Sequence, residues 1–116
     1  MRTSDQKLSN ALKSQIVKTF AQTISDLSSF DEMYKFLNDF FNSSELETFA
    51  KRLAVAYWLK KGRSYTNIKQ NLKVSSATIA SIQNEMSKSG FKLALKKLEA
   101  EEWATQWSER IKKIIK

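Results

Sequence analysis

SYTNIKQNLKVSSATIASIQNEM, residues 64–86, is the stretch of sequence that decides the predicted fold. It divides into a short helix over 65–72, which Ser64 can cap, and a second helix over 76–86. Ser75 precedes the second helix and suits its N-cap, because a serine oxygen can accept a hydrogen bond from a free backbone N–H. Ile68 and Leu72 lie four apart and share one face of the first helix. Val74 can point inward from the turn, and Ile79 and Ile82 of the second helix complete the small core. The pattern predicts a helix-turn-helix.

The rest of the second helix carries small or polar uncharged side chains, which can approach base edges closely. They are Ser76, Ala77, Thr78, Ala80, Ser81, Gln83 and Asn84. A recognition helix of this kind enters a DNA major groove by its N-terminal residues. An ordinary pair of packed helices fits the same pattern, so the pattern alone leaves both interpretations open.

Charge favours the DNA interpretation. The chain carries a net charge of +8, and residues 48–87 contribute +6 of it from seven basic and one acidic side chain. No acidic residue lies between Glu47 and Glu85. A polyanionic partner is the simplest physical reason to keep carboxylates out of so long a stretch. The alternative is a basic protein whose charge only keeps it in solution.

Composition limits the fold and the chemistry. The 116 residues predict one domain, and two Gly, no Pro and no strand-like alternation predict an all-α fold. The chain has neither Cys nor His, so it lacks thiolate ligands and the commonest general base and metal ligand. We therefore expect that the protein is not an enzyme and that it binds neither a metal ion nor a cofactor.

No apolar run approaches the roughly 18–20 residues that a membrane span needs, and the first ten residues, MRTSDQKLSN, lack the apolar region of a signal peptide. The expectation is a soluble, cytoplasmic protein.

The N-terminal segment 1–43 is predicted to form two helices. Apolar residues over 8–27 recur at spacings of three and four, which is typical of an amphipathic helix. The capping box SFDE at 29–32 predicts a second helix over 30–41. Short amphipathic helices are not stable alone, so both must pack on something.

A long central helix follows within 44–63. The sequence SELE at 44–47 is a second capping box, and it predicts a helix over 45–61. Gly62 suits the C′ position after that helix.

Residues 91–116 are predicted to form a long amphipathic helix, whose apolar stripe is Phe91, Leu95, Leu98, Trp103, Trp107, Ile111, Ile114 and Ile115. It could extend a dimer interface, fold back on its own core, or touch DNA through Lys112, Lys113 and Lys116. A membrane-surface role is a further alternative for such a basic amphipathic helix. The chain is thus interpreted as a single domain, 1–116, with segments 1–43, 44–63, 64–87 and 91–116.

Residues 40–86, FFNSSELETFAKRLAVAYWLKKGRSYTNIKQNLKVSSATIASIQNEM, resemble the Trp repressor superfamily. They look closest to the YerC/YecD-like branch, which carries a similar S-Y-x-x-I segment followed by S-x-A-T-I. The resemblance extends over about residues 14–86. It implies an all-helical, intertwined homodimer in which the helices of segment 1–43 are the dimerisation helices. Such a dimer presents two helix-turn-helix units to successive major grooves and favours a pseudo-palindromic operator.

The family's best-known member binds tryptophan as corepressor through two arginines. Arg52 matches the first, but the second falls on Ser81, which cannot clamp a carboxylate as a guanidinium can. The segment between Gly62 and Ile68 is also one residue shorter than in that member. A tryptophan corepressor is therefore not expected. Three roles stay open for Arg52: it binds a ligand, it supports the structure, or it contacts a phosphate. Lys73 stands where Gly is common in the turn, and a positive φ at this position would have a conformational cost for Lys.

The resemblance also implies which residues of this chain contact DNA: they are Lys69, Ser76, Ala77 and Ala80, with Thr78 nearby. We expect Arg63, Lys69 and Lys73 to contact phosphates, and these contacts position the protein. The residues expected at base edges are Ser76, Ala77, Ala80 and Ser81. Such small side chains discriminate bases weakly, so DNA shape and water should contribute to specificity. Alternatively, Ala77 and Ala80 are small only to permit helix packing.

These observations predict a dimeric, sequence-specific DNA-binding transcriptional regulator, a repressor, whose partners are double-stranded DNA and a second copy of the chain. The alternative is a helical interaction or scaffolding protein with a degenerate helix-turn-helix.

Overall fold

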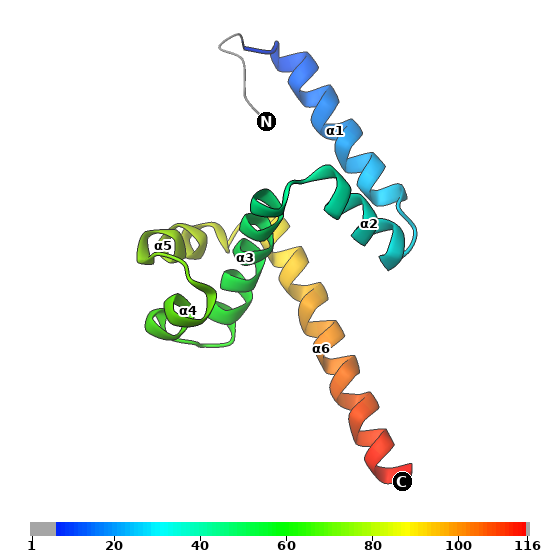
Figure 1. The fold of residues 1–116 in the computed structure, drawn as a ribbon, viewed down its shortest axis with the longest axis vertical. Helices are drawn as coiled ribbons and strands as arrows, with labels where there is room; N and C mark the ends of the chain where they lie inside the picture. Colours follow the sequence, from blue (N-terminus) through cyan, green and yellow to red (C-terminus); the bar gives the residue numbers. More distant parts are fainter. Residues whose placement is uncertain (1–6, 116) are drawn as a thin grey trace. The chain divides into compact units, whose positions relative to one another are not determined.

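The computed structural model describes the backbone of residues 7–115 and the side chains of residues 7–102 and Thr105 (Figure 1). The regular elements in this part of the chain are helices: α1 (Asn10–Asp26), α2 (Phe30–Phe40), α3 (Ser43–Lys60), α4 (Tyr65–Leu72), α5 (Ser76–Glu85) and α6 (Ser89–Ile115). The predicted all-α fold is confirmed.

The chain divides into two compact units, one up to Leu46 and the other from Glu47 onward. The interpretation of the chain as one domain stays a prediction. None of the described helices combines the length and the apolar character that crossing a membrane requires.

The first unit contains α1 and α2, which contact each other through phenylalanine rings. The Phe20 ring centroid lies 6.3 Å from that of Phe36 and 5.5 Å from that of Phe40. Neither helix has a buried residue. Leu12 and Ile16, on the predicted stripe of α1, are 45% and 47% exposed. The two helices therefore pair without building a core of their own.

The capping box at the start of α2 differs in one bond from the prediction. Ser29 Oγ accepts a hydrogen bond from the Glu32 N–H, as expected, over 3.1 Å. The Glu32 carboxylate, however, accepts from the backbone N–H of Ser28 over 2.9 Å, one residue before the cap. It also accepts from the Ser28 hydroxyl, which explains why the carboxylate lies at that residue.

The start of α3 was predicted two residues too late. Asn42 caps the helix, because its Oδ1 accepts from the Glu45 N–H over 2.8 Å and Glu45 Oε1 accepts from the Asn42 N–H over 3.0 Å. Asn is as good an N-cap as Ser, and this reciprocal pair is a complete capping box. The NSSE of residues 42–45 is therefore the capping box, in place of the predicted SELE.

The end of α3 is as predicted, with Gly62 at C′. Gly62 has a φ of +86°, a left-handed conformation that glycine adopts without a steric penalty. The Arg63 N–H bonds to the Trp58 carbonyl over 3.1 Å, and the Gly62 N–H bonds to the Leu59 carbonyl over 3.0 Å. These two bonds form a Schellman motif, which satisfies carbonyls that the helix end would leave free.

The second unit is built on one core shared by four helices. Its fully buried residues come from α3, α4, α5 and α6: Val55, Ala56, Ile68, Ile79, Ile82 and Leu95. Leu72 and Val74 pack against this core, as the sequence predicted. Fully burying one such side chain contributes roughly 1.5–3 kcal/mol. The five apolar residues expected to form a small core therefore lie in or against one core, to which α3 adds Val55 and Ala56.

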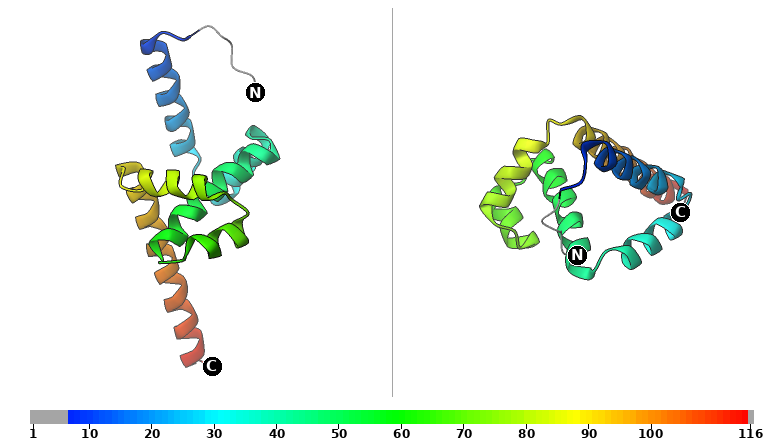
Figure 2. Two further views of the ribbon diagram at one scale, coloured as in Figure 1. Left: turned by 90° about the vertical axis from the view of Figure 1, so that its left-hand side faces the viewer. Right: turned by 90° about the horizontal axis from the view of Figure 1, so that it is seen from above.

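Helix α6 begins at Ser89, two residues earlier than predicted, and its C-terminal part extends away from α3 (Figures 1 and 2). Leu95 is buried, and Phe91 and Leu98 pack against the core. The first part of α6 therefore folds back on the core of its own unit. Of the predicted stripe, Trp103, Trp107, Ile111, Ile114 and Ile115 have side chains outside the described set, as do Lys112, Lys113 and Lys116.

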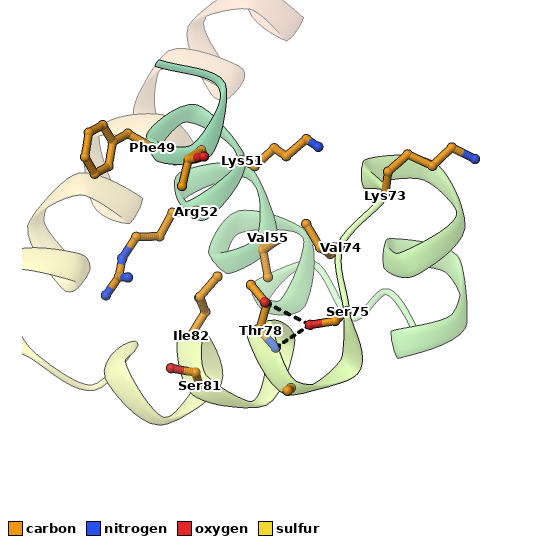
Figure 3. Close-up of a pocket in the computed structure, with 12 residues that line it drawn as sticks. Phe49, Lys51, Arg52, Val55, Lys73, Val74, Ser75, Thr78, Ser81 and Ile82 are labelled. Carbon is orange, nitrogen blue, oxygen red and sulfur yellow. Dashed lines mark hydrogen bonds between the residues drawn. The ribbon is translucent and has the colours of Figure 1, made fainter. Parts of the chain in front are cut away.

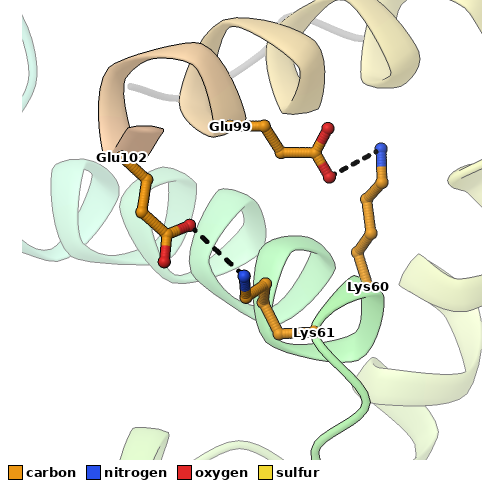
Figure 4. A network of polar contacts seen from close by, with 4 residues as sticks. All are labelled: Lys60, Lys61, Glu99 and Glu102. Carbon is orange, nitrogen blue, oxygen red and sulfur yellow. Dashed lines mark ion pairs between the residues drawn. The ribbon is translucent and has the colours of Figure 1, made fainter. Parts of the chain in front are cut away.

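Two ion pairs connect α6 to the C-terminal end of α3 (Figure 4). Lys60 Nζ lies 3.2 Å from a Glu99 carboxylate oxygen, and Lys61 Nζ lies 3.5 Å from one of Glu102. All four side chains are more than a third exposed, so each pair contributes little stability. The pairs nevertheless direct two of the cations near the helix-turn-helix toward α6.

Candidate nucleic-acid interface

Helices α4 and α5, the two helices of the predicted helix-turn-helix, lie side by side, and α4 has the predicted bounds (Figure 2). Ser64 caps α4, because its Oγ accepts from the Asn67 N–H over 3.1 Å. Ser75 caps α5 in the same way, accepting from the Thr78 N–H over 3.1 Å. Both caps were predicted, so the sequence alone determined where both helices of this motif begin.

The turn between the two helices passes through Lys73. This residue has φ 55° and ψ 51°, a left-handed conformation, and its N–H bonds to the Lys69 carbonyl. It is the one non-glycine residue with a positive φ among the residues that the structure describes. A side chain in this conformation costs about 1 kcal/mol relative to glycine. The conformational cost expected for Lys at this position is therefore present.

The side chains of Tyr65 and Gln83 join α4 to α5. The Tyr65 hydroxyl donates a hydrogen bond to the Gln83 side-chain oxygen. This bond fixes the two helices relative to each other near the C-terminal half of α5. It also engages Gln83, which the sequence had grouped with the free polar side chains of the second helix.

The predicted base-edge residues share one exposed surface of α5. Ser76, Ala77, Ala80 and Ser81 are all exposed, whereas Ile79 and Ile82 of the same helix are buried. Because Ala77 and Ala80 do not lie in the core, packing within the described part of the chain does not require their small size.

Thr78 is also exposed, but its hydroxyl has a local partner. Thr78 Oγ1 and Ser75 Oγ share a hydrogen bond of 2.9 Å (Figure 3). Thr78 therefore belongs to the cap of α5, next to the residues that face outward.

The three predicted phosphate-contact cations lie around this motif. Arg63 stacks on α3, with its guanidinium carbon 4.0 Å from the Trp58 ring centroid, and donates to Asn67 Oδ1 over 3.4 Å. Lys69 and Lys73 are exposed and, among the described residues, form no ion pair. One preoriented guanidinium and two unpaired ammonium groups therefore flank the exposed helices.

The stacking of Arg63 on Trp58 could have been anticipated from the sequence. A Schellman motif brings the C″ residue against the C3 residue of the same helix. With Gly62 at C′, these residues are Arg63 and Trp58. Locating the glycine therefore predicts the contact.

A cavity of 620 Å³ lies between α3 and the helix-turn-helix (Figure 3). Arg52 and Ser81, the two positions that the resemblance associates with a ligand, both line it. Lys73 also lines it and lies on the side opposite Arg52. The guanidinium carbon of Arg52 lies 5.5 Å from the ring centroid of Phe91, at the start of α6. The structure thus brings the two positions to one cavity, where Ser81 supplies a hydroxyl in place of a second guanidinium.

Comparison with known proteins agrees with this geometry. The model of the Trp repressor protein family matches residues 15–99. A Bacillus subtilis protein, "Uncharacterized protein YerC", is 33% identical over 61 residues, which span 53% of this chain and 59% of that protein. The crystal structure of a TrpR-like protein from Eubacterium eligens superposes with a TM-score of 0.70 at 29% identity, covering 78% of this chain and 96% of that one. The family match spans most of the chain, which therefore belongs to the Trp repressor protein family.

Proposed function

We propose that this chain is a dimeric, sequence-specific DNA-binding transcriptional regulator of the cytoplasm, a repressor, and not an enzyme. One observation carries the proposal. The helix-turn-helix exposes the N-terminal half of α5 beside Lys69 and Lys73, neither of which has an ion-pair partner among the described residues. Membership of a family named for a repressor supports the same function.

The contacts divide by chemistry. We assign phosphate contacts to Arg63, Lys69 and Lys73, because cations at a helix-turn-helix fix its register on the duplex. Base edges would meet the exposed residues of α5, which are Ser76, Ala77, Ala80 and Ser81. Thr78 lies next to them and holds the cap. With such small side chains, much of the specificity would come from DNA shape and bridging water.

The homodimer is proposed from the exposed apolar surface of α1 and α2. Leu12, Ile16 and Val17 are 45%, 47% and 58% exposed, and neither helix has a buried residue. A second copy of the chain offers the same surface, and a twofold dimer would present two copies of α5 to the duplex.

We do not propose tryptophan as a ligand. Ser81 cannot form the bidentate contact that a second arginine would give to a carboxylate. Isothermal titration calorimetry with tryptophan should therefore give no binding isotherm, and a saturable isotherm with a micromolar constant would overturn this part of the proposal.

A salt titration of binding to duplex DNA tests the proposal. Affinity should fall steeply with salt, because cations of the protein displace counterions from phosphates. Replacing Lys69 with Ala should weaken binding to all sequences and lower the salt slope by about 0.9. Replacing Lys97 with Ala, an exposed lysine of α6, removes the same charge and should leave the slope unchanged. Absence of duplex binding even at low salt would reject DNA binding in favour of a helical interaction protein.

A further inference from the structure

Arg52 is an exposed residue of α3 whose side chain contacts a residue of α6. Its guanidinium carbon lies 5.5 Å from the ring centroid of Phe91, which is half-buried in the first turn of α6 and packs against the core. A guanidinium over an aromatic face is attracted by the ring quadrupole. The contact therefore connects α3 to the start of α6.

Arg52 also lies at the junction of two cavities. It lines the 620 Å³ cavity together with Ser81 of α5, and it lines a second cavity of 480 Å³ together with Phe91 and Lys88. Phe49 lines both cavities as well, so these two residues of α3 lie between a space beside the recognition helix and a space beside the start of α6.

The C-terminal end of α5 is close enough to be affected by the same charge. Glu85, its last residue, forms an ion pair with Lys88. The hydrogen bond and the charge of Lys88 lower the pKa of Glu85, and the charge of Arg52 lowers it further. Only residues 86–88 separate α5 from α6, so a displacement of the first turn of α6 would be transmitted to the end of α5.

We propose that Arg52 is a positioning residue for DNA binding. By holding Phe91 it keeps the start of α6, and with it the C-terminal end of α5, in the arrangement in which α5 meets DNA. The inference rests on the proposed DNA-binding function.

A double-mutant cycle in DNA affinity tests the contact. Replacing Arg52 with Met keeps the aliphatic stem and removes the charge, and replacing Phe91 with Leu keeps apolar bulk and removes the ring. Each variant should bind duplex DNA about twofold to fivefold more weakly, the range expected of an exposed cation–π contact. The double variant should lose no more than either single variant, because both remove one interaction. Replacing Phe91 with Tyr should keep the affinity. Independent, multiplicative losses, or no loss, would overturn the proposal.

The salt slope distinguishes positioning from direct contact. Replacing Arg52 with Met should leave the slope of log K against log salt at the wild-type value, because no phosphate contact is removed. A slope lowered by about 0.9 would mean that Arg52 itself contacts a phosphate, which contradicts the proposal.

Lys51 provides the matched control, because it is the neighbouring cation on α3, lines the 620 Å³ cavity and pairs with Glu47. Replacing it with Met should leave the affinity unchanged, and a loss equal to that at Arg52 would contradict a role specific to Arg52. Failure of the wild-type chain to bind duplex DNA would reject the DNA-binding function itself. Normal wild-type binding that is unaffected at Arg52 would reject only the positioning role.

Discussion

Lys73 adopts a left-handed backbone conformation in the turn before α5, where we propose that its charge contacts DNA. Its backbone is left-handed, and its side chain is exposed in the turn before α5. Glycine would adopt this conformation without the steric penalty, but it would remove a cation from beside the recognition helix. The retention of Lys here is explained if its charge contributes to DNA binding.

Replacing Lys73 with Gly should therefore have opposite effects on folding and binding. The free energy of unfolding should rise by about 1 kcal/mol, because glycine has no Cβ atom to clash with the carbonyl oxygen in the left-handed conformation. DNA affinity should fall, and the salt slope should decrease by about 0.9. Urea denaturation and binding titrations measure the two effects.

Replacing Lys73 with Ala is the control, because it removes the charge and keeps the Cβ atom. It should reproduce the loss of affinity without the gain in stability. If the glycine variant bound DNA as tightly as the wild type, Lys73 would have no role at the interface.

At the scale of helices, the helix ends that were predicted correctly are those that a single residue type determines. Ser64, Ser75 and Gly62 were assigned correctly, because a capping oxygen and a positive φ leave few other choices. The start of α3 was missed because two overlapping capping boxes, NSSE and SELE, compete there, and Asn42 forms the one observed.

Contacts between distant side chains were not predictable from helical spacing. The Tyr65–Gln83 hydrogen bond joins residues 18 positions apart, and the Arg52–Phe91 contact joins α3 to α6. Such pairs depend on how helices pack, which a spacing pattern along one helix does not specify. Arg52 was accordingly considered for a ligand, a phosphate or a structural role, and the structure shows the internal contact.

The two glycines of the chain allow a matched test of the α3 terminus. Neither has an atom within 4 Å of the place where a Cβ would lie, so a substitution causes no clash. Replacing Gly62 with Ala should lower the free energy of unfolding by about 1 kcal/mol or more, because its φ is +86°. Replacing Gly90 with Ala, at a helical position, should raise it by about 0.5 kcal/mol. Equal effects of both changes, measured by urea denaturation, would contradict the Schellman assignment.

At the scale of the whole molecule, the two units differ in how far they bury their apolar side chains. The helices α1 and α2 contribute exposed apolar side chains and no buried residue, whereas the second unit has a closed core. This contrast is expected if the first unit completes its packing only when a second copy is present. The sequence predicted dimerisation helices in this segment, and the homodimer stays a prediction.

Replacing Ile16 with Glu should weaken self-association by at least about tenfold, because an unpaired carboxylate would be buried at the interface. Analytical ultracentrifugation over a range of concentrations measures the change. Replacing Ser14 with Glu adds the same charge two residues away, on the opposite side of α1, and should leave association unchanged. Equal behaviour of the two variants would argue against α1 as the dimer interface.

Selection of bound duplexes from a random DNA pool tests the central claim most directly, because it reports specificity and symmetry together. A dimer that inserts two copies of α5 should enrich a pseudo-palindromic sequence with half-site centres roughly 10 base pairs, or about 34–36 Å, apart. Substitutions at Ser76 or Ala77 should change the enriched bases, whereas replacing Lys69 with Ala should weaken binding without changing them. A pool that shows no enrichment, or enrichment that does not respond to changes in α5, would contradict recognition of DNA by this helix.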